Sequence, residues 1–521
     1  MNVDSVQILI AMVFYILVVV GIGVYFAKRA NENSDNYFLG GRSLGPWVAA
    51  MSAEASDMSG WLLMGLPGVA YWCGLSDAFW TAIGLAVGTY LNWLLVAKRL
   101  RHYSVVAGNS ITIPEFFSNR FKEKTKVIRF IASAFILVFF TVYAASCFVT
   151  CGKLFSSLFG LNYQLMMIIG AVFVIVYTFL GGFLAESSSD FIQGIVMIVA
   201  LVLILATGTA AAGGPEAILN NIKNIPGFFN FFGIAQPQLA DGVQQVSAGA
   251  PLFGEAGSYG FLTIISTLSW GLGYFGMPQV LLRFMAIRRS SEIKKSRIIA
   301  TVWCVISLFA AVAVGIIGRV LYPSEAMLLT SSGAENVFIV LSANLLPPLI
   351  AGVVMSGILA ATMSSSDSYL LIASSAFAKD IFQGIFKKDA TEKQIMMLSR
   401  ITLLLISLFG IIIALNENSV IFKVVAFAWA GFGATFGPLM IFSLFWKRVT
   451  RTGAIAGMLA GGGMVFLWKL LIKPIGGVFG IYELLPAFVV SCIFIVLVSL
   501  LTRKPSAEIE NEFEAAKTMI E

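Results

Sequence analysis

Long apolar runs, separated by short polar segments, fill nearly the whole chain of 521 residues. A helix that crosses a bilayer needs about 20 consecutive and mostly apolar residues. By this measure the pattern predicts an all-α integral membrane protein with about thirteen transmembrane helices. The predicted spans lie near residues 6–27, 46–72, 75–97, 127–157, 162–184, 189–212, 259–282, 298–321, 346–378, 394–414, 419–446, 453–472 and 480–502.

The composition agrees with a membrane domain that leaves no room for a sizeable soluble one. Apolar residues make up 58% of the chain and charged residues 12%, whereas a soluble domain carries about 25% charged residues. The mean hydropathy is +0.89. The first apolar run is long enough to span a bilayer, and no small-residue cleavage site clearly follows it, so we expect a membrane helix there rather than a signal peptide.

Three polar segments carry secondary expectations. The segment 213–258 contains Gly, Pro and Asn residues and predicts an irregular external loop with room for a short helix. The loop 98–126 contains a short amphipathic pattern at 114–117, which predicts a short helix. The tail after Pro505 is polar and acidic, so we expect a solvated helix or a disordered end.

The net charge of the chain is +7, and the basic residues that produce it are predicted to lie mostly on one side of the membrane. If the N-terminus is extracellular, loops such as 98–129 and 283–297 are cytoplasmic, as is the C-terminus. All but six of the 34 lysines and arginines then fall on the cytoplasmic side; the exceptions are Lys153, Lys223, Arg319, Lys423, Lys469 and Lys473. This asymmetry predicts a multi-pass protein of the cell membrane in that orientation. The basic excess therefore serves topology, and we expect no nucleic-acid partner.

No enzyme signature is evident in the sequence. The single histidine, His102, lies in a basic loop, and the five cysteines include no CxxC pair, so packed free thiols are expected rather than a metal site. There is no phosphate-binding loop and no histidine for a serine-based triad. The spelling Gly271-x-Gly273-x-x-Gly276 lies inside a membrane span without the strand that a dinucleotide site needs. We predict that the protein is not an enzyme.

Two predicted spans are interrupted. Residues 51–61 of the second span contain small and hydroxylated residues with Glu54 and Asp57, and residues 269–278 of the seventh contain three glycines and a proline. Paired interruptions five spans apart are typical of a transporter site built on inverted repeats. A glycine-rich helix can also be simply a packing surface.

Acidic and hydroxylated residues inside these spans suggest a cation path. Asp57 is costly in a bilayer unless it serves a cation or bonds to backbone at the helix break. Glu54 lies one turn nearer the cytoplasmic end, where we expect water to reach it. In the ninth span, 360–368 is rich in hydroxyl groups, which either bond back to their own helix or bind an alkali cation together with carbonyls of the broken helix. Asp367 fits either the ion path or an ion pair.

For other polar and aromatic residues the sequence allows both a structural role and a functional one. Asp190 opens the sixth span, where it either caps the helix or serves as an exit step for the ion. Trp270, Tyr274 and Tyr143 either pack helices or line a small-solute pocket. Amides freed near Ser59 and Gly60 are suited to hold a substrate carboxylate, as helix N-termini do for anions.

These residues resemble the solute:sodium symporter family. The matching stretches are Asn36-Tyr-Phe-Leu-Gly-Gly-Arg-Ser-Leu-Gly-Pro46, Ala55-Ser-Asp-Met-Ser-Gly-Trp-Leu-Leu-Met-Gly-Leu-Pro-Gly68, Trp270-Gly-Leu-Gly-Tyr-Phe-Gly276, Arg283-Phe-Met285 and Ala426-Phe-Ala-Trp-Ala430. The resemblance implies the leucine-transporter type of fold, with two five-helix inverted repeats. The expected divisions are a leading helix and loop (1–45), the first repeat (46–212), an extracellular loop (213–258), the second repeat (259–446), two trailing helices (447–504) and a cytoplasmic tail (505–521).

The resemblance also implies a function and a set of site residues. It implies symport of L-proline with sodium into the cell by alternating access, or of another small carboxylate solute such as pantothenate or another amino acid. The sodium ligands would be carbonyls of Ala55, Met58 and Ala361 and hydroxyls of Ser364 and Ser365. The ion-coupling acids would be Asp57 and Asp190, and Ser188 replaces the family's usual aromatic before Asp190. The substrate pocket would comprise Ser59, Gly60, Trp61, Tyr143, Trp270 and Tyr274. A membrane enzyme or receptor would instead need catalytic residues or a soluble signalling domain.

Overall fold

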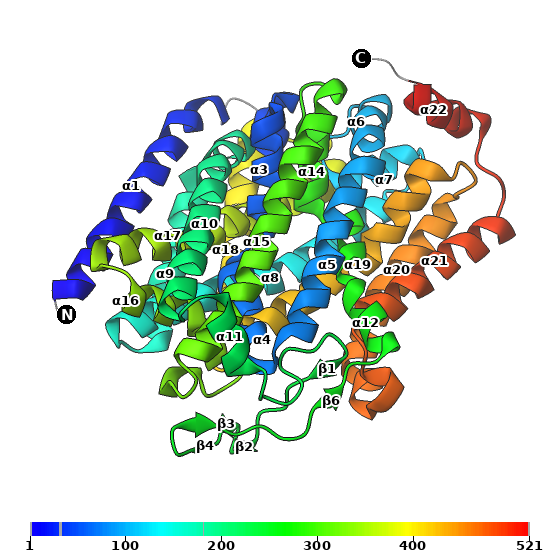
Figure 1. Ribbon diagram of the computed structural model, residues 1–521. Helices are drawn as coiled ribbons and strands as arrows, with labels where there is room; N and C mark the ends of the chain where they lie inside the picture. The colour runs from blue at the N-terminus through cyan, green and yellow to red at the C-terminus, as the bar shows by residue number, and fades with distance from the viewer. Residues whose placement is uncertain (1–2, 31–33, 181, 519–521) are drawn as a thin grey trace.

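Membrane-length helices dominate the computed structural model, which describes residues 3–30, 34–180 and 182–518. Within these residues, ten helices are long and apolar enough to cross a membrane, and each coincides with a predicted span. The other three predicted spans, 46–72, 162–184 and 259–282, fall on shorter apolar helices, two of them interrupted. The helices lie side by side in one bundle (Figure 1). The predicted helical membrane architecture is therefore confirmed, and ten spans have full length.

The helices of the first half are as follows: α1 (Val3–Ala30), α2 (Ser34–Leu39), α3 (Pro46–Asp57), π-helical η2 (Trp61–Gly65), α4 (Leu66–Cys73), α5 (Leu75–Leu91), π-helical η3 (Asn92–Val96), α6 (Ala97–Val106), α7 (Ile113–Arg120), α8 (Val127–Phe159), α9 (Tyr163–Leu180), α10 (Phe183–Ala211) and α11 (Pro215–Ile222). A one-turn helix, η1 (Gly40–Arg42), follows α2.

The helices of the second half are α12 (Phe261–Leu268), α13 (Trp270–Gly273), η4 (Tyr274–Gly276), α14 (Pro278–Ala286), η5 (Ser290–Glu292), α15 (Ile293–Leu321), η6 (Ala326–Leu328), η7 (Gly333–Asn336), α16 (Val337–Leu345), α17 (Pro348–Ser375), π-helical η8 (Ala376–Phe386), α18 (Glu392–Ala414), α19 (Ile421–Phe445), α20 (Arg451–Leu467), π-helical η9 (Trp468–Ile472), η10 (Lys473–Ile475), η11 (Gly477–Gly480), α21 (Leu484–Leu501) and α22 (Ala507–Thr518).

The loop 213–258 contains the expected short helix, α11, and three small antiparallel ladders that the sequence did not suggest (Figure 1). The ladders pair β1 (Gly233–Ile234) with β6 (Gly257–Ser258), β2 (Leu239–Ala240) with β3 (Val243–Gln244), and β4 (Val246–Ser247) with β5 (Ala250–Pro251). The turn between β2 and β3 contains Asp241 and Gly242, both at positive φ. An Asp-Gly pair favours such tight hairpins, so the residues at this turn account for the hairpin of β2 and β3.

Both predicted helix breaks are present. The helix α3 ends at Asp57, and Met58 takes a non-helical conformation (φ −83°, ψ 67°) before the π-helical turn η2. In the seventh span, Met277 is extended (φ −76°, ψ 109°) between η4 and α14. The next residue, Pro278, has no N–H to continue the preceding helix but is well suited to begin a new one. Each break therefore leaves backbone groups without their usual helical partners.

Close contacts between helices rest on glycine. Gly84 and Gly88 lie one turn apart on α5, and a Cβ added to Gly88 would lie 2.8 Å from the carbonyl carbon of Gly271 on α13. Such small-xxx-small spacing lets two backbones approach in a membrane. The second helix break is therefore held directly against α5.

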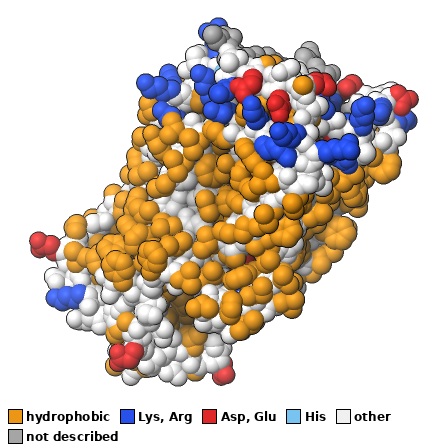
Figure 2. All heavy atoms as spheres, turned by 90° about the vertical axis from the view of Figure 1, so that its right-hand side faces the viewer, with side chains coloured by type: hydrophobic (Ala, Val, Ile, Leu, Met, Phe, Trp, Pro, Cys, Tyr) orange, Lys and Arg blue, Asp and Glu red, His pale blue; other side chains and the backbone are white. Residues whose placement is uncertain are grey.

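The outer surface separates into an apolar band and a basic end. Figure 2 shows hydrophobic side chains over most of one face and lysines and arginines gathered at its upper end. We call this the basic end; it is formed by α6, α7, α22 and the segments next to them (Figure 1). Large apolar side chains are exposed on other helices too, such as Phe14 of α1 (69%) and Leu501 of α21 (85%). Such a surface suits a lipid environment rather than water.

The C-terminal tail is a docked helix. Phe513 of α22 is buried, with its ring 6.2 Å from Tyr103 of α6 and beneath the guanidinium of Arg120. Lys122 pairs with Glu508 and Glu512, and the latter pair raises the pKa of Lys122. Of the two expectations for the tail, the helix is confirmed, and one side of it is packed rather than solvated. The short helix expected near 114–117 is α7.

Candidate ion and substrate site

The first helix break lies directly against the serines of α17. Ser364 Oγ donates a hydrogen bond of 2.8 Å to the carbonyl oxygen of Ala55, and Ser365 Oγ donates one of 3.3 Å to the same oxygen. This carbonyl is available because α3 ends: the amide of Ser59, its partner in a continuous helix, bonds instead to the carbonyl of Asp57 at 3.0 Å. The break therefore creates an oxygen site between two helices.

The other predicted sodium ligands lie around the same point. The Ala361 carbonyl accepts a 3.3 Å hydrogen bond from Ser364 Oγ one turn along α17. Met58 is buried in the break itself, although no described hydrogen bond joins it to α17. Carbonyl and hydroxyl oxygens without net charge are the hard ligands that an alkali cation needs. The arrangement can hold a sodium ion once the serine hydroxyl hydrogens turn away from Ala55.

Asp57 is a buried carboxylate with little compensation. It is 0% exposed and is the last residue of α3, at the negative end of the helix dipole. Gln279 Nε2 lies 3.5 Å from Oδ1, the Tyr274 hydroxyl is nearby, and Oδ2 has no hydrogen-bond partner among the described residues. No described hydrogen bond joins its side chain to backbone, so the alternative of a simple helix-break cap has no support. The geometry favours a nearby cation.

Glu54 lies one turn before Asp57 in α3, and its solvent exposure differs from what we expected. We expected water to reach it, but it is 1% exposed and lies near Trp93 of η3 and near Asp57. The expectation was wrong because η3 and neighbouring helices cover this end of α3. Glu54 is therefore a second buried acid beside the break.

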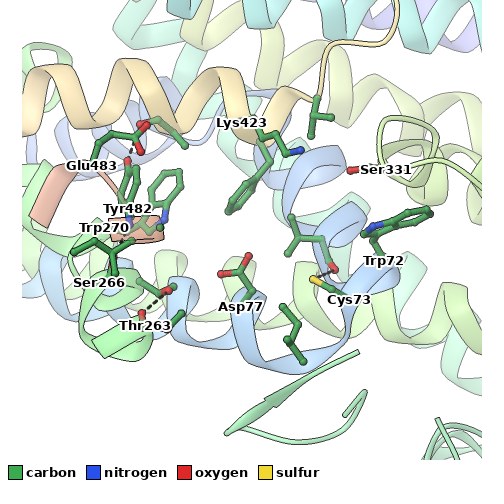
Figure 3. A pocket seen from close by; sticks show the side chains of 18 of the residues that line it. Trp72, Cys73, Asp77, Thr263, Ser266, Trp270, Ser331, Lys423, Tyr482 and Glu483 are labelled. Carbon is green, nitrogen blue, oxygen red and sulfur yellow. Dashed lines mark hydrogen bonds between the residues drawn. The ribbon is translucent and has the colours of Figure 1, made fainter. Parts of the chain in front are cut away.

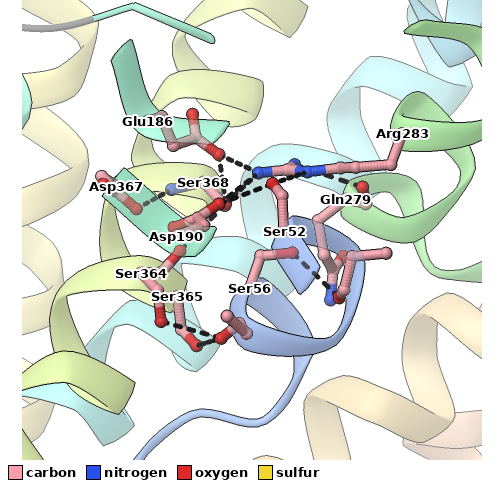
Figure 4. A network of polar contacts seen from close by, with 12 residues as sticks. Ser52, Ser56, Glu186, Asp190, Gln279, Arg283, Ser364, Ser365, Asp367 and Ser368 are labelled. Carbon is pink, nitrogen blue, oxygen red and sulfur yellow. Dashed lines mark hydrogen bonds and ion pairs between the residues drawn. The ribbon is translucent and has the colours of Figure 1, made fainter. Parts of the chain in front are cut away.

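A buried arginine organises the polar groups above the serines (Figure 4). Arg283 of α14 donates from Nε to Ser52 Oγ (2.9 Å) and from Nη2 to Glu186 Oε1, to Ser368 Oγ (2.9 Å) and to Asp190 Oδ2 (3.2 Å). Ser52 Oγ in turn donates to Asp190 Oδ2 at 2.7 Å. The network joins α3, α10, α14 and α17. It compensates two acids with one fully buried guanidinium.

One sequence-based alternative, a helix cap at Asp190, is corrected here. Asp190 lies seven residues inside α10, which begins at Phe183, so it does not cap the helix. The capping signal misled because α10 starts about one turn before the run Ser187-Ser-Ser-Asp190, which places Asp190 about two turns inside the helix. The charge pattern groups Arg283 with the cytoplasmic loop residues, and the structure buries its side chain completely (0% exposed).

Glu186 and Ser52 were missed as members of the network. The spacing of Glu186 and Asp190 on one helix face was an available signal. Nothing local marked Ser52, because its partners come from α10 and α14.

Asp367 stands apart from the arginine. Its Oδ1 accepts a 2.8 Å hydrogen bond from the amide of Ser368, and its Oδ2 has no partner among the described residues. No ion pair within 4.0 Å joins it to Arg283 or to any other described cation. It borders a small cavity of about 10 Å³ together with Tyr177 and Glu186. The ion-pair interpretation of Asp367 therefore has no support.

The six predicted substrate residues gather around the two breaks. Trp61 of η2 packs against Trp270 of α13 with ring centroids 6.0 Å apart. Tyr143 of α8 lies near Ser59 and stacks on Tyr369 of α17 at 4.3 Å. Tyr274 faces Asp57. Gly60 is pressed against α8, since an added Cβ would lie 2.9 Å from Thr150 Cβ. Tertiary structure thus brings together residues from four helices.

A larger cavity of about 450 Å³ lies beside Trp270, at the end of the bundle that carries loop 213–258 (Figure 3). Trp270 stacks on Tyr482 at 5.1 Å, and Tyr482 donates through its hydroxyl to the Ala426 carbonyl at 2.6 Å. Asp77 and Lys423 also border the cavity. Trp270 therefore belongs both to the cavity wall and to the aromatic cluster at the break. The sequence did not suggest Tyr482, because its contact depends on the docking of the trailing helices.

The fold and site together define a helical membrane protein of the secondary-transporter class, with paired broken helices around buried polar groups. The model of the sodium:solute symporter family matches residues 37–461. The chain belongs to the sodium:solute symporter family. It is 42% identical over 519 residues to the "Sodium/proline symporter" of Staphylococcus aureus (strain USA300 / TCH1516), covering 98% of this chain and 96% of the relative.

Solved structures support the same fold. A substrate-bound, outward-open Na⁺-coupled sialic acid symporter matches with a TM-score of 0.75 at 20% identity, covering 96% of this chain and 99% of the other. A nucleobase-cation-symport-1 family transporter matches with a TM-score of 0.53 at 13% identity, covering 93% and 100%. At these identities the likeness concerns the fold alone, which is that of the leucine-transporter type.

Proposed function

We propose that this chain is a sodium-coupled symporter that carries L-proline into the cell by alternating access. The observation that carries the proposal is the 42% identity, over nearly the full length of both chains, to a sodium/proline symporter. Membership of the sodium:solute symporter family supports sodium as the driving ion. Inward movement of one charge at 100 mV contributes about 2.3 kcal/mol, before any sodium gradient is counted.

The proposed sodium site joins the broken helix to α17. Its ligands are the carbonyls of Ala55, Met58 and Ala361 and the hydroxyls of Ser364 and Ser365. The hydrogen bonds from both serines to Ala55 support it, because they already hold these oxygens within ligand reach of one another. Sodium would tie α3 to α17 more firmly than the two neutral hydrogen bonds do.

The proposed proline pocket lies beside this site. Amides of the break near Ser59 and Gly60 would hold the proline carboxylate, since backbone amides without helical partners attract anions. Trp61, Tyr143, Trp270 and Tyr274 would enclose the apolar ring of the substrate. Their aromatic contacts across the two breaks support the assignment.

Sodium and proline would be coupled through the first break. Asp57 would supply the charge that makes cation binding near the break favourable, and its burial without a paired cation supports that role. Binding of sodium would order the break and so complete the proline pocket. Asp190 would act on the inner side of the path, where Arg283 and Ser52 hold its carboxylate.

The proposed topology follows the same assignment. It has thirteen spans: a leading helix in 1–45, inverted repeats over 46–212 and 259–446, and two trailing helices over 447–504. The loop 213–258 and the N-terminus are extracellular, and the tail 505–521 is cytoplasmic. The basic end, rich in lysine and arginine, supports this orientation through the positive-inside rule.

Uptake by reconstituted vesicles tests the proposal. Labelled proline should accumulate only when sodium is more concentrated outside, and collapse of the sodium gradient should abolish accumulation. Competition by a panel of unlabelled solutes, including pantothenate and other amino acids, tests the substrate. Proline uptake that does not depend on the sodium gradient would contradict coupling. If another carboxylate competes more strongly than unlabelled proline does, that carboxylate is the better candidate for the substrate.

A further inference from the structure

Another polar cavity lies at the basic end, and none of its lining residues belongs to the proposed transport site. Its volume is about 290 Å³, and it lies where the end of η8, the start of α8 and α7 meet. Four of its lining residues are cationic and one is acidic: Lys126, Arg129, Lys379 and Lys388 against Glu115. Gln383 and Gly384 complete the lining. Such an excess of positive charge around a hollow attracts an anion.

Arg129 forms the buried wall of this cavity. It is 7% exposed, and its Nη2 pairs with Glu115 at 2.8 Å while Nε lies 3.5 Å from Asp380. No described hydrogen bond or ion pair involves Nη1 of Arg129. This group lies against Gly384, and both residues line the cavity. A Cβ added to Gly384 would lie 3.0 Å from Arg129 Cδ and 3.2 Å from Cζ, so only glycine admits the guanidinium here. The Nη1 group of this buried guanidinium is thus available to donate hydrogen bonds to a ligand.

Lys126 is held beside it at a cost in backbone energy. Its φ is 61°, a left-handed conformation that is unusual for residues other than glycine and that often marks functional positions. Glu123 already accepts the first amides of α8, from Val127 at 3.0 Å and Ile128 at 2.9 Å, so Lys126 is not needed as a cap. Burial, together with the nearby charges of Arg129 and Lys388, lowers the pKa of Lys126. A bound anion would relieve this repulsion.

The same elements present apolar side chains outward. Val127 and Phe130 at the start of α8 are 37% and 50% exposed, and Phe386 at the end of η8 is 75% exposed. An amphiphile with an anionic head and apolar tails would satisfy both the cavity and these side chains. We propose that this cavity binds a phosphate group, supplied by the headgroup of an anionic phospholipid whose acyl chains lie along α8 and η8.

Lipid binding to the purified full-length protein tests this inference without any transport assay. Native mass spectrometry would compare phosphatidylglycerol with phosphatidylcholine on the wild type and on Lys126→Gln/Lys388→Gln. Arg129 is left in place, because its removal would strand Glu115 and Asp380. We expect a preference for phosphatidylglycerol in the wild type and a loss of about fivefold in affinity for each lysine removed.

The matched control is Lys98→Gln/Lys294→Gln, which removes the same charge from two exposed lysines, of α6 and α15, that do not line the cavity. It should keep the preference, and thermal unfolding should show that both double variants are folded. Titration with inorganic phosphate separates the sources: if phosphate alone binds in a Lys126- and Lys388-dependent way and displaces phosphatidylglycerol, the site is a phosphate site open to solution. An equal loss in the control, or no preference for the anionic lipid in the wild type, overturns the proposal.

Discussion

Ser364 Oγ of α17 donates a 2.8 Å hydrogen bond to the carbonyl oxygen of Ala55, which lies 309 residues earlier in the chain. The bond exists because α3 ends two residues after Ala55, so that the amide that would have taken this oxygen turns elsewhere. A break in one helix and a hydroxyl in another therefore form a single polar site. The proposed sodium coupling depends on this contact.

Replacing Ser364 by alanine should weaken sodium binding. The variant loses one ligand oxygen to a cation, and a hydrogen bond or contact to a charged group contributes about 1.5–3 kcal/mol, or roughly 10- to 100-fold. The sodium concentration for half-maximal proline uptake should rise by that factor. The matched control is Ser366→Ala, since Ser366 Oγ bonds only to its own helix, at Thr362 (2.6 Å) and Met363 (3.2 Å). Equal shifts in both variants would argue against a sodium site at Ser364.

Replacing Asp57 by asparagine should uncouple transport from sodium. The change keeps the shape and removes the buried charge, so the cation loses the negative charge that Asp57 supplies at the break. An interaction with a charged group contributes up to about 3 kcal/mol, which corresponds to a factor of about 100. We therefore expect proline uptake to fall by about that factor and to lose most of its response to sodium. Measurement is initial uptake against sodium concentration in vesicles. Glu54→Gln removes the neighbouring buried acid and should keep the sodium response; a normal response in Asp57→Asn would remove Asp57 from the mechanism.

Replacing Arg283 by glutamine should destabilise the protein. The variant leaves Glu186 and Asp190 buried without their cation, which typically costs about 3–5 kcal/mol. Thermal unfolding in detergent should show a clear drop in melting temperature. Adding Glu186→Gln should recover part of that loss. The control, Arg288→Gln, breaks an exposed pair with Glu292 and should leave the melting temperature unchanged; a drop of similar size there would mean that charge removal alone is responsible.

Replacing Gly88 by alanine should disturb the contact between α5 and the second helix break. The added methyl group would meet the backbone of Gly271, which cannot move aside as a flexible side chain does. Overpacking of this kind costs about 1–3 kcal/mol, so both the melting temperature and proline uptake should fall. Gly463→Ala is the control, because nothing lies within 4 Å of the position of its Cβ. If the two variants have the same melting temperature, the close backbone contact at Gly88 is not important for stability.

Replacing Trp270 by alanine should weaken proline binding even at saturating sodium. The indole packs on Trp61 and Tyr482 and lines the approach to the proposed pocket. Loss of a large aromatic wall should raise the KM for proline about tenfold, and Trp270→Phe should restore most of it. Ser364→Ala, assayed in the same way, should show a nearly normal KM because excess sodium compensates for its defect. A normal KM in Trp270→Ala would place the substrate elsewhere.

The helix breaks were predictable from local chemistry. Gly, Ser and Pro residues in 51–61 and 269–278 lower the tendency to form a continuous helix, and the structure ends α3 at Asp57 and begins α14 at Pro278. Buried acids could be proposed in the same way, because a carboxylate within an apolar run has few harmless explanations. The family could also be recognised, since whole motifs span these breaks.

Local rules failed where a residue takes its partner from a distant segment. The run before Asp190 resembles a helix cap, but α10 begins earlier and Asp190 bonds to Ser52 and Arg283. The position of Arg283 near a span end suggests a loop charge, yet its side chain is buried and bonds to residues of three other helices, α3, α10 and α17. Glu54 was expected to be wet, and the covering helices exclude water from it.

The sequence by itself determined the membrane class, the approximate spans, the two interruptions and the family, because each depends on composition or on residues adjacent in the chain. Tertiary structure decided which oxygens face one another: Ser364 with Ala55, Glu186 and Asp190 with Arg283, Trp61 with Trp270. The physical reason is that in a membrane the polar groups freed by a helix break must find partners inside the protein. Which helix supplies those partners depends on how the bundle packs.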